Sequence, residues 1–563
     1  VVSILIFSAL SAFIFKGTSK LQHFSSRLQW RGLNLINTEN SIYGNITITS
    51  MTDQYSFFEN GLLMFTTGDL LTSEETVHFA LLEHPSPKRV LLIGGGVGGS
   101  LEQVLKYSVE EVDYIELDPL VIKTAQRFLP ESNLLPLRDK RVKIEHIDGR
   151  LFTKKTTKKY DVVIVNLPDP FTALLNRFYS LEFFKEVKDI LNDKGVLSFG
   201  VTSSENYVSY ELQQFLGCLY ATLKKVFSDV KMIPGDYNYF LASNAPNLLT
   251  YDYNLLMKRL RERGIQTKFV REYYLPYKLS KGRVAYIEET IRKAREIKIN
   301  RDFEPIGYYY DMVLWSTYFH SRVKEVIGKF SKLNFWWLLT PIGLFFVITF
   351  PFVLKKPSLK KLPVIIAIST TGFSEILFQV VVIISFQVLY GYVYYKLGLI
   401  LTSFMIGLVF GSWTINRIMG RLKNSLRTYI KTQISICIYP LILPPIFLGL
   451  ASFGSKIPSY VGIETIFAFL PIIAGFIGGF QFPLASKICL EGGEKVGRTA
   501  GLLYGVDLLG SCLGALLASA ILIPILGIIS TLILVAILNF VTLILILTSY
   551  FGSGRVLSKN LQK

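Results

Sequence analysis

Seven long apolar segments fill the last part of this 563-residue chain, from residue 334 to residue 563. They lie at residues 335–354, 363–391, 395–415, 428–452, 461–481, 500–523 and 527–550. An α-helix needs about 20 predominantly apolar residues to cross the hydrocarbon core of a bilayer. The pattern therefore predicts an all-α, multi-pass transmembrane bundle of about seven helices over residues 334–563, with the lipid bilayer as its surroundings.

The distribution of charge supports this membrane assignment. Residues 334–563 hold 17 of the 60 Lys and Arg residues but only 5 of the 42 Asp and Glu residues. Apolar spans joined by basic loops are typical of a membrane domain, and they argue against a nucleic-acid partner. The four cysteines and five histidines show no metal-ligand spacing, so we expect neither a metal site nor a disulfide framework.

The part of the chain before residue 334 has a different pattern. Residues 1–15 are uniformly apolar, and we interpret them as the end of a transmembrane helix; a signal-peptide core is the alternative, although its charges would precede the apolar stretch. Residues 16–72 alternate apolar and polar side chains around glycine turns, which predicts an N-terminal β-strand subdomain with hairpins. Residues 247–333 are polar and mostly helical, and we expect a helical connector there.

Between these regions, residues 73–246 alternate strand-like and helical segments. The buried, strand-like runs are RVLLIGGG, EEVDYIELD, RVKIEHID, KYDVVIVNLPDP and GVLSFGV. Strand, helix and strand at this spacing predict a doubly wound parallel sheet. The expected fold is therefore an α/β Rossmann-like domain of the class I methyltransferase type.

A glycine-rich loop ends the first of these strands. Gly94, Gly96 and Gly98 belong to GGGVGG, where glycines let the backbone turn tightly and approach a ligand. Glu116 ends the next strand about 20 residues later, where a carboxylate can accept hydrogen bonds from both ribose hydroxyls. Asp148, after the third strand, is placed to accept a hydrogen bond from an adenine amino group. We predict a nucleotide-binding site here; a glycine turn that binds nothing is the alternative.

Several longer stretches form a set in a fixed order. They are RVLLIGGGVGGSLEQVLKY, VDYIELDPLVI, IDGRLF, YDVVIVNLPDP and NRFYSLEFFKEVKDILNDKGVLS. This set resembles the spermidine/spermine synthase family of aminopropyltransferases, and IGYYYDMVLWS, GFSEILFQ, FMIGLVFGS and LLYGVDLLGSCLGALLAS are similar to its membrane-fused, multi-pass branch. The resemblance implies decarboxylated S-adenosylmethionine, or S-adenosylmethionine itself, as donor, and a small amine or polyamine as acceptor.

Two positions depart from the pattern of that family. Val97 stands where its glycine loop carries an aspartate, and Asn166 stands where its DSSDP loop has the first aspartate. Asp169 is retained. The resemblance implies that Asp169 and Asn166 face the reacting amine, where a carboxylate helps to position and deprotonate it. Asparagine can hydrogen-bond the same atoms but cannot take a proton, so we expect weakened acceptor chemistry.

Other candidates for the acceptor side come from the helix before the first strand and from tyrosines. Glu75 and His78 lie one turn apart, and Glu75 could bind the distal amine; a solvated helix face with a packed histidine is the alternative. Tyr43, Tyr179 and Tyr237 are candidates to line an amine channel, because aromatic faces attract cations. For any one of 30 tyrosines, a structural role is the alternative.

Two acids fall inside the apolar segments, Glu375 and Asp507. An acid at bilayer depth costs about 2.5–3.5 kcal/mol on insertion scales, so each should face the bundle interior or a cavity. A cation or proton site is one interpretation. The alternative is a buried polar contact between helices in which the two acids share a proton.

Three hypotheses for function remain open. The first is a membrane-anchored, spermidine synthase-like transferase that acts in polyamine biosynthesis. The second is a catalytically degenerate domain that binds a nucleotide or polyamine and is coupled to the bundle or to a partner in a membrane complex; a homo-oligomer is compatible with both. The third is an S-adenosylmethionine-dependent methyltransferase.

We expect an integral protein of the inner or plasma membrane whose Rossmann-like domain lies in the cytoplasm, where an adenosyl donor is made. The basic loops of the apolar region fall on one side when the spans are counted, which favours the cytoplasm for that side. A crossing at 335–354 would then place the Rossmann-like domain outside. Either that segment does not cross or the domain is exported.

Overall fold

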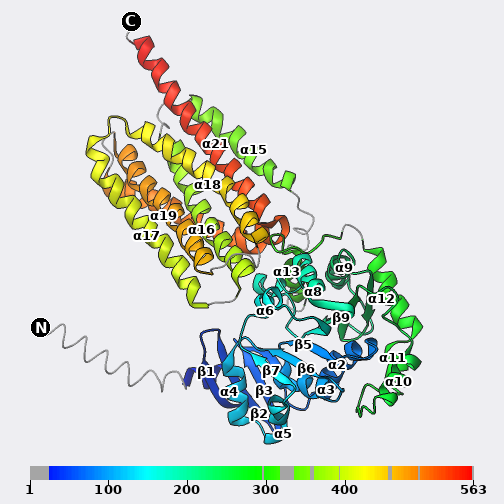
Figure 1. Cartoon of the computed structure of the whole chain (residues 1–563). Helices are drawn as coiled ribbons and strands as arrows, with labels where there is room; N and C mark the ends of the chain where they lie inside the picture. Colours follow the sequence, from blue (N-terminus) through cyan, green and yellow to red (C-terminus); the bar gives the residue numbers. More distant parts are fainter. Residues whose placement is uncertain are drawn as a thin grey trace, which may run out of the picture.

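The computed structural model describes residues 24–294, 297–317, 335–355, 361–391, 394–453, 460–491 and 495–560. The helix end predicted at residues 1–15 lies outside the described residues. Two parts are visible in Figure 1: an α/β part, and an elongated helical bundle that stands on one side of it.

The chain enters the α/β part through a small antiparallel sheet. Its strands are β1 (Asn34–Asn40), β2 (Asn45–Met51), β3 (Gln54–Glu59) and β4 (Leu62–Thr66), each paired with the next. Asn60 and Gly61 both have positive φ between β3 and β4, as a tight hairpin turn requires. These strands lie within residues 16–72, for which hairpins were predicted.

The main sheet has seven strands in the described residues. They are β5 (Arg89–Ile93), β6 (Glu111–Ile115), β7 (Val142–Glu145), β8 (Tyr160–Val165), β9 (Leu191–Thr202), β10 (Asp229–Ile233) and β11 (Tyr237–Ser243). Their order is β10-β11-β9-β8-β5-β6-β7, with β5 to β9 parallel and β11 antiparallel to both neighbours. This arrangement is the predicted class I methyltransferase-type fold.

Helices cover both faces of this sheet. Those of the α/β part are α2 (Leu70–Glu83), α3 (Leu101–Leu105), α4 (Pro119–Phe128), α5 (Glu131–Leu134), α6 (Gly149–Lys155), α7 (Ala173–Asn176), α8 (Leu181–Ile190) and α9 (Tyr210–Lys224). Alternate residues of β5 serve opposite cores, because Val90 and Leu92 pack with α2 to α4, whereas Leu91 and Ile93 pack with α8 and α9. Both faces are therefore buried, as a mostly parallel sheet requires.

A helical segment connects the sheet to the bundle. It contains α10 (Tyr253–Glu262), α11 (Leu275–Lys278), α12 (Lys281–Lys293) and α13 (Ile306–Ser316). α13 lies against α9 and also contacts the beginning of the last bundle helix, so its apolar side chains belong to the core of the α/β part.

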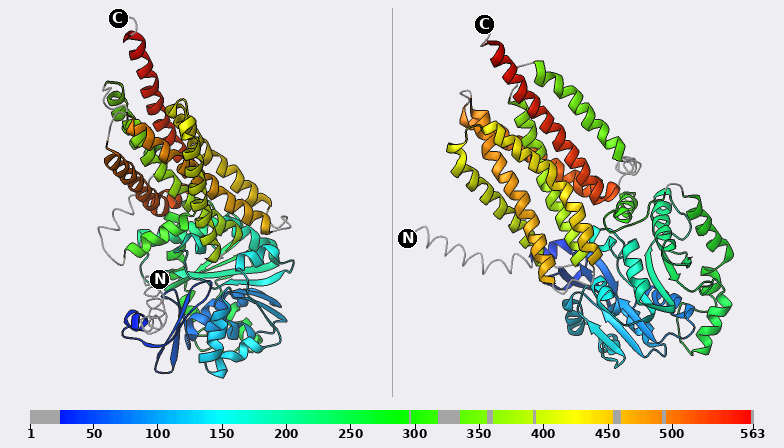
Figure 2. Two further views of the ribbon diagram at one scale, coloured as in Figure 1. Left: turned by 90° about the vertical axis from the view of Figure 1, so that its left-hand side faces the viewer. Right: turned by 45° about the horizontal axis from the view of Figure 1, so that its top comes forward.

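The bundle consists of long helices that run back and forth. They are α15 (Phe335–Lys355), α16 (Leu362–Tyr390), α17 (Tyr394–Ile418), α18 (Ser425–Phe453), α19 (Tyr460–Leu490), α20 (Val496–Leu517) and α21 (Ile523–Asn560). The closest pairs are α17 with α19, α16 with α20 and α18 with α21, and α15 lies beside α21 (Figure 2). Gly510 and Gly514 of α20 face the backbone of α16, where any side chain would collide with Ser369 or Phe373.

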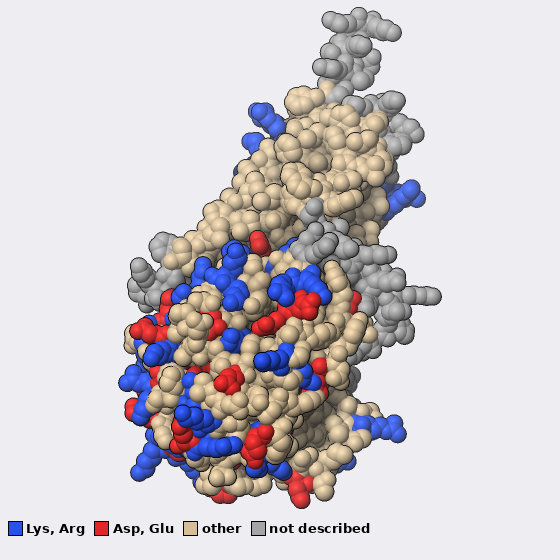
Figure 3. Space-filling view, turned by 90° about the vertical axis from the view of Figure 1, so that its right-hand side faces the viewer, with Lys and Arg blue, Asp and Glu red and all other residues tan. Residues whose placement is uncertain are grey.

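Among the described residues, five helical runs are long and apolar enough to cross a membrane. These are Leu362–Tyr390, Lys396–Arg421, Ser425–Ser452, Glu464–Leu490 and Val496–Phe551. The last run contains both α20 and α21, and α15 adds a shorter apolar helix, Phe335–Pro351. In Figure 3 charged side chains cover the α/β part, whereas the visible surface of the bundle is almost entirely uncharged.

The start of α21 and the end of α16 both contact residues of the α/β part or its connector. At the start of α21, the Ile528 N–H donates to the Phe303 carbonyl oxygen at 2.7 Å. At the end of α16, Gly391 has a φ of +107° and lies so close to Asp148 that an added Cβ would sit 3.2 Å from its carboxyl carbon. The bundle therefore ends directly beside a predicted nucleotide-binding residue.

Candidate active site

The glycine loop joins β5 to the helical turn at Gly96–Ser100 and then to α3. Gly94 and Gly95 have φ values of +75° and +68°, which side chains rarely adopt. A Cβ on Gly96 would lie 2.5 Å from the Tyr114 ring, and one on Gly98 would lie 2.8 Å from Phe65. Space and backbone conformation thus both require glycine. Val97, in place of the family's aspartate, is 5% exposed and packs in the core between the sheet and α2 to α4.

Glu116 lies at the carboxyl end of β6, next to the glycine loop. Its carboxylate accepts a hydrogen bond of 2.7 Å from the Tyr114 hydroxyl. Burial raises the pKa of Glu116 to about 7, and the nearby acids Glu59 and Asp118 act in the same direction. Asp118 caps α4 by accepting from the Leu120 N–H. The buried acids Glu116 and Asp118 suit ligand hydroxyl groups, which donate hydrogen bonds without bringing a charge.

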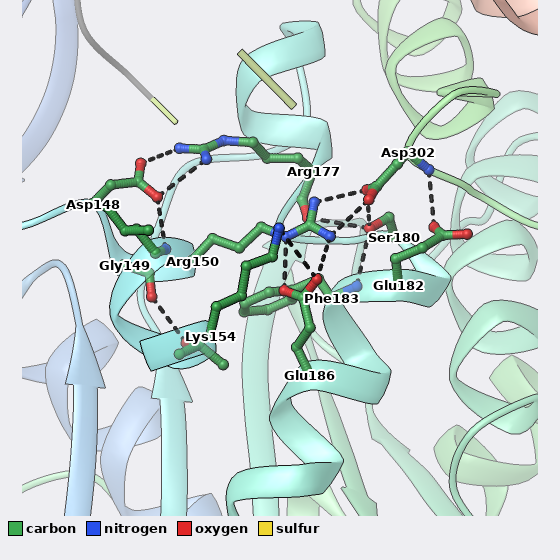
Figure 4. Close-up of polar contacts among 12 residues, drawn as sticks. Asp148, Gly149, Arg150, Lys154, Arg177, Ser180, Glu182, Phe183, Glu186 and Asp302 are labelled. Carbon is green, nitrogen blue, oxygen red and sulfur yellow. Dashed lines mark hydrogen bonds and ion pairs between the residues drawn. The ribbon is translucent and has the colours of Figure 1, made fainter. Parts of the chain in front are cut away.

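Asp148 already has partners inside the chain. Its Oδ1 caps α6 by accepting from the Leu151 N–H at 3.0 Å, and both carboxylate oxygens accept from the Arg177 guanidinium (Figure 4). Arg177 is 2% exposed and lies over the Phe178 ring. A ligand amino group would therefore share Asp148 with Arg177, so the adenine role remains a prediction.

Asn166 follows β8 and contacts the glycine loop. Its backbone N–H donates to Ile93, and its side-chain amide donates to the Ser100 hydroxyl at 2.9 Å. The side chain also covers Gly95, where any Cβ would collide with it. Asn166 thus joins the loop after β8 to the glycine loop, which a neutral amide can do without introducing a charge.

Asp169 lies in the same loop, three residues further on. Its Oδ1 accepts from the Thr202 N–H at 3.0 Å, and burial raises its pKa above the ordinary value. Tyr237 is 46% exposed, and partial burial together with the negative charge of Asp169 raises its pKa. Tyr179 is fully buried and donates to the Pro168 carbonyl oxygen at 2.7 Å, so its hydroxyl holds the loop in place.

Glu75 forms a buried ion pair with a lysine of the connector. Lys278 Nζ lies 2.6 Å from Glu75 Oε1, and the Tyr274 hydroxyl donates to the same oxygen at 2.5 Å. Both charged side chains are less than one-tenth exposed. Lys278 therefore occupies the position beside Glu75 that was predicted for the distal ammonium group of the amine substrate.

In the described residues, His78 and Tyr43 form hydrogen bonds with residues other than Glu75, Asn166 and Asp169. The two ring nitrogens of His78 contact the Tyr107 hydroxyl at 2.7 Å and Gln103 Oε1 at 3.2 Å, and burial lowers its pKa to about 4. This environment favours a neutral, packed histidine. Tyr43 is partly buried in the turn between β1 and β2, where its N–H donates to the Ser41 hydroxyl.

The two acids of the bundle face neighbouring helices. Glu375 of α16 lies against Gly478 of α19, and Asp507 of α20 lies against Gly372 of α16. Both positions agree with the expectation that acids inside apolar segments turn away from lipid. Their proposed role in binding a cation or proton remains a prediction.

The sequence pattern did not identify the partners of Asp148, Glu75 and Asn166. Ser100 and Arg177 lie within motif stretches and Lys278 does not, but no spacing singled out any of them, since each meets its partner only through the tertiary fold. Asp311 in α13 was also missed, although it lies within the quoted stretch IGYYYDMVLWS. Among the described residues there is no group of three His, Cys, Asp or Glu side chains that could hold a metal ion.

The sheet order, the glycine loop and the acid at the end of β6 define an α/β domain of the class I methyltransferase type. Residues 70–238 match the Spermine/spermidine synthase domain. The chain therefore carries a spermine/spermidine synthase domain followed by apolar helices, and the resemblance inferred from the sequence is confirmed.

The chain is also similar to individual proteins and to a solved structure. A polyamine aminopropyltransferase of Saccharolobus solfataricus is 28% identical over 281 residues, which cover 47% of this chain and 89% of that protein. The polyamine aminopropyltransferase of Korarchaeum cryptofilum is 37% identical over 175 residues, which cover 31% of this chain and 53% of that protein. A crystal structure of spermidine synthase in complex with the transition-state analogue AdoDATO is 24% identical, with a TM-score of 0.40, over 46% of this chain and 89% of that one.

Proposed function

We propose that this chain is a membrane-anchored aminopropyltransferase that moves an aminopropyl group from decarboxylated S-adenosylmethionine to a small amine. The observation that carries the proposal is the meeting of three segments at the carboxyl edge of one sheet, within a spermine/spermidine synthase domain. These are the glycine loop after β5, Glu116 after β6 and the Asn166–Asp169 loop after β8. Ligands of doubly wound sheets bind at this edge.

The donor side supplies backbone and carboxylate groups. Glycines allow the adenosyl group to approach the backbone of the loop, and Glu116 accepts hydrogen bonds from the ribose hydroxyls when it is ionised. Asp148 is the candidate for the adenine amino group, with Arg177 holding its carboxylate in position. These residues bind and orient the donor, which is the main task in a displacement between two bound partners.

The acceptor side must bring a neutral amine nitrogen to the donor carbon. An amine arrives as an ammonium ion, so a carboxylate that first pairs with it and then takes its proton is needed. Asp169 is the acid of the β8 loop, and its raised pKa makes it a better proton acceptor than an ordinary aspartate. Asn166 keeps the loop attached to Ser100 but adds no negative charge.

A transfer assay on the full chain in detergent tests the proposal. We would offer decarboxylated and ordinary S-adenosylmethionine with a panel of diamines and polyamines and analyse the products by mass spectrometry. An acceptor that gains one aminopropyl group supports the proposal and names the substrate. A gain of one methyl group would favour the methyltransferase hypothesis, and binding of the donor without any product would favour a degenerate sensor.

Asn166→Asp sharpens this assay. If the missing acid limits the acceptor chemistry, restoring it should raise transfer. Asp169→Asn provides the opposite change at the neighbouring position and should abolish most of the activity. Equal activity in wild type and both variants would show that the β8 loop does not act on the amine.

We propose that the α/β part faces the cytoplasm, because the adenosyl donor is made there. The charges of the bundle argue for the opposite placement. α16 ends and α21 begins beside the α/β part, so Lys361, Arg427 and Lys495, which lie at the starts of α16, α18 and α20, belong to the far end. Basic loops normally stay in the cytoplasm.

Labelling with a membrane-impermeant maleimide decides the orientation. Lys88→Cys reports on the α/β part and Arg427→Cys on the far end, each in a background in which the exposed Cys512 is replaced by serine. We expect the cysteine at position 88 to react only after the cells are permeabilised. Its labelling in intact cells would contradict the cytoplasmic placement and would favour the sensing hypothesis.

A further inference from the structure

Asp311 is a buried carboxylate without a hydrogen-bond partner among the described residues. It lies on α13 and is 0% exposed, and neither of its side-chain oxygens accepts a hydrogen bond there. Burying an acid costs free energy unless it is protonated, paired or bound to a ligand. Two of the acids predicted for binding, Glu75 and Asp148, have a lysine and an arginine as partners. Asp311 therefore requires a separate explanation.

The position of α13 is fixed by hydrogen bonds to the loops around the candidate site. The Gly307 N–H donates to Asn300 Oδ1 and the Tyr308 N–H donates to Asn176 Oδ1, both at 3.0 Å. Asn300 in turn donates to the Tyr179 carbonyl oxygen at 2.8 Å. α13, which carries Asp311, is thus tied to the segment that follows the β8 loop.

The charged group that acts on Asp311 is Asp169 of the β8 loop. Burial raises the pKa of Asp311 to about 8, and the second cause is the negative charge of Asp169. Asp311 in turn raises the pKa of Tyr179 and of Tyr308 on its own helix. No lysine or arginine of the described residues contributes to the pKa of Asp311. Two carboxylates without a cation between them form a place for a positively charged ligand.

We propose that Asp311 is the second carboxylate of the acceptor site and that, with Asp169, it receives a primary ammonium group and supplies the negative charge that the β8 loop lacks at Asn166. The inference rests on the proposed function and deepens it. It concerns a residue outside the matched domain at residues 70–238, on the connector that leads into the bundle. The ligand class is an aliphatic primary amine that carries one charge to this pair.

The proposed step moves one proton and one aminopropyl group. The ammonium gives one proton to the carboxylate pair, and its nitrogen lone pair then forms the bond to the aminopropyl carbon of the donor. The carbon–sulfur bond breaks and its electron pair stays on sulfur, which becomes a neutral thioether. The product nitrogen remains a protonated secondary amine. The pair can hold the released proton, since two neighbouring carboxylates in a dry site share one proton readily.

Asp311→Asn tests the proposal in the full chain. We expect the affinity for the amine, measured with putrescine by calorimetry and as KM in the transfer assay, to fall about 10- to 100-fold, the loss typical of a hydrogen bond to a charged group. Binding of the donor product 5′-methylthioadenosine should not change. The double variant Asn166→Asp/Asp311→Asn should regain most of the amine affinity, because it restores two carboxylates.

The pH profile separates this role from a purely structural one. In wild type, amine affinity should rise as the pH approaches 8, since the ammonium must displace the proton of the pair. Asp311→Asn should lose this dependence and Asp311→Glu should keep it. Asp229→Asn is the matched control, because Asp229 is also a buried acid but bonds the Leu249 N–H at the opposite edge of the sheet.

The possible failures can be told apart. Wild type that transfers no group to any amine contradicts the proposed function itself. Active wild type together with an Asp311→Asn variant of unchanged amine affinity and pH profile overturns only the role of Asp311. If Asp311→Asn does not fold, the infrared difference spectrum of wild type with and without putrescine decides. Loss of a protonated-carboxyl band on amine binding supports the inference, and no change in that region contradicts it.

Discussion

The interiors of the α/β part and of the bundle both contain polar networks, but they are built from different groups. Arg150 in the α/β part is 1% exposed and makes two-pronged contacts with Glu186 and with Asp302, at 2.7–2.8 Å (Figure 4). Ser180 also donates to Asp302 at 2.6 Å. This network ties α6 and α8 to the connector that precedes α13.

The bundle uses neutral amides and hydroxyls for the same purpose. Thr371 donates to Gln481 at 2.7 Å, Gln481 donates to Gln433 at 2.7 Å, and Gln433 donates to Thr542 at 2.9 Å. Asn539 adds a bond of 2.6 Å to Ser374. The chain of bonds crosses α16, α19, α18 and α21 without a formal charge.

The difference follows from the cost of removing each group from water. A buried ion loses several kcal/mol of hydration, which only close and complete pairing offsets, whereas a buried amide loses much less. The α/β part folds in water and can bury a fully paired arginine. For helices apolar enough to span a membrane, as these are, neutral hydrogen bonds hold the core of the bundle together at lower cost. Each of the following variants tests one side of this comparison.

Arg150→Met should have the largest effect on stability. It leaves Glu186 and Asp302 buried without their shared cation, and breaking a buried ion pair in this way costs about 3–5 kcal/mol. The measurement is urea unfolding of the detergent-solubilised chain, followed by circular dichroism. Lys154→Met is the control, because Lys154 Nζ is 3.6 Å from Glu186 at the edge of the network and its loss should cost less than about 1 kcal/mol. Equal effects of the two variants would contradict the importance of complete pairing.

Glu116→Gln should have the next largest effect, on donor binding. Glu116 is a buried acid whose pKa burial raises from 4.5 to about 7, so it is mostly protonated below that pH and mostly ionised above it. A raised carboxyl pKa stabilises the fold below pH 4.5, and this contribution is lost as the pH rises through 7. Binding of ribose hydroxyls has the opposite dependence, because only the ionised carboxylate accepts both bonds.

We therefore expect the affinity of the wild type for 5′-methylthioadenosine to rise between pH 5.5 and pH 7.5. The rise should be at most about 10-fold per pH unit. Glu116→Gln should weaken binding by about 10- to 100-fold at pH 8 and remove the pH dependence. Calorimetry at several pH values measures both. Glu110→Gln, at an exposed position before β6, is the control that should change neither. A variant that keeps the pH dependence would show that another group causes it.

Local order in the sequence made much of this site predictable. Strands, the glycine loop and the acids that follow β6 and β8 are adjacent in the chain, so the alternation of strands and helices was enough to place Glu116 and Asp169 at one edge of the sheet. Hydropathy alone identified the apolar helices, because each is longer than a helix buried in a small domain needs to be.

The partners of the charged residues could not be predicted in the same way. Lys278 reaches Glu75, and Asp302 reaches Arg150, only after the connector has folded back over the sheet. No spacing rule links residues so far apart in the chain. The polar network of the bundle was missed for the same reason, since Gln433 and Gln481 look like isolated polar residues until their helices are packed.

Gln481→Leu tests the neutral network. It leaves Thr371 and Gln433 without their partner, and a hydrogen bond between membrane helices contributes on average about 0.6 kcal/mol, at most about 1.7 kcal/mol. We expect a loss of about 1 kcal/mol in the unfolding free energy of the bundle, measured in bilayer-like bicelles. Thr402→Val is the control, because Thr402 bonds only to Gly398 of its own helix at an exposed position. A loss as large as that of Arg150→Met would remove the distinction between the two interiors.

Lys88→Ala should have the smallest effect on the unfolding free energy. It tests whether burial causes the larger effect of Arg150→Met. Lys88 Nζ lies 2.9 Å from Glu110, but the two side chains are 49% and 64% exposed. Water screens such a pair, and the entropy lost by fixing the two side chains offsets most of the attraction. The unfolding free energy should therefore change by less than about 1 kcal/mol, and this change should vanish in 1 M salt. Arg150→Met should keep its effect at the same salt concentration, since ions do not reach the buried network. If salt weakened both effects alike, the Arg150 network would behave as a surface pair, and the contrast between a paired-charge interior and an amide interior would lose its physical basis.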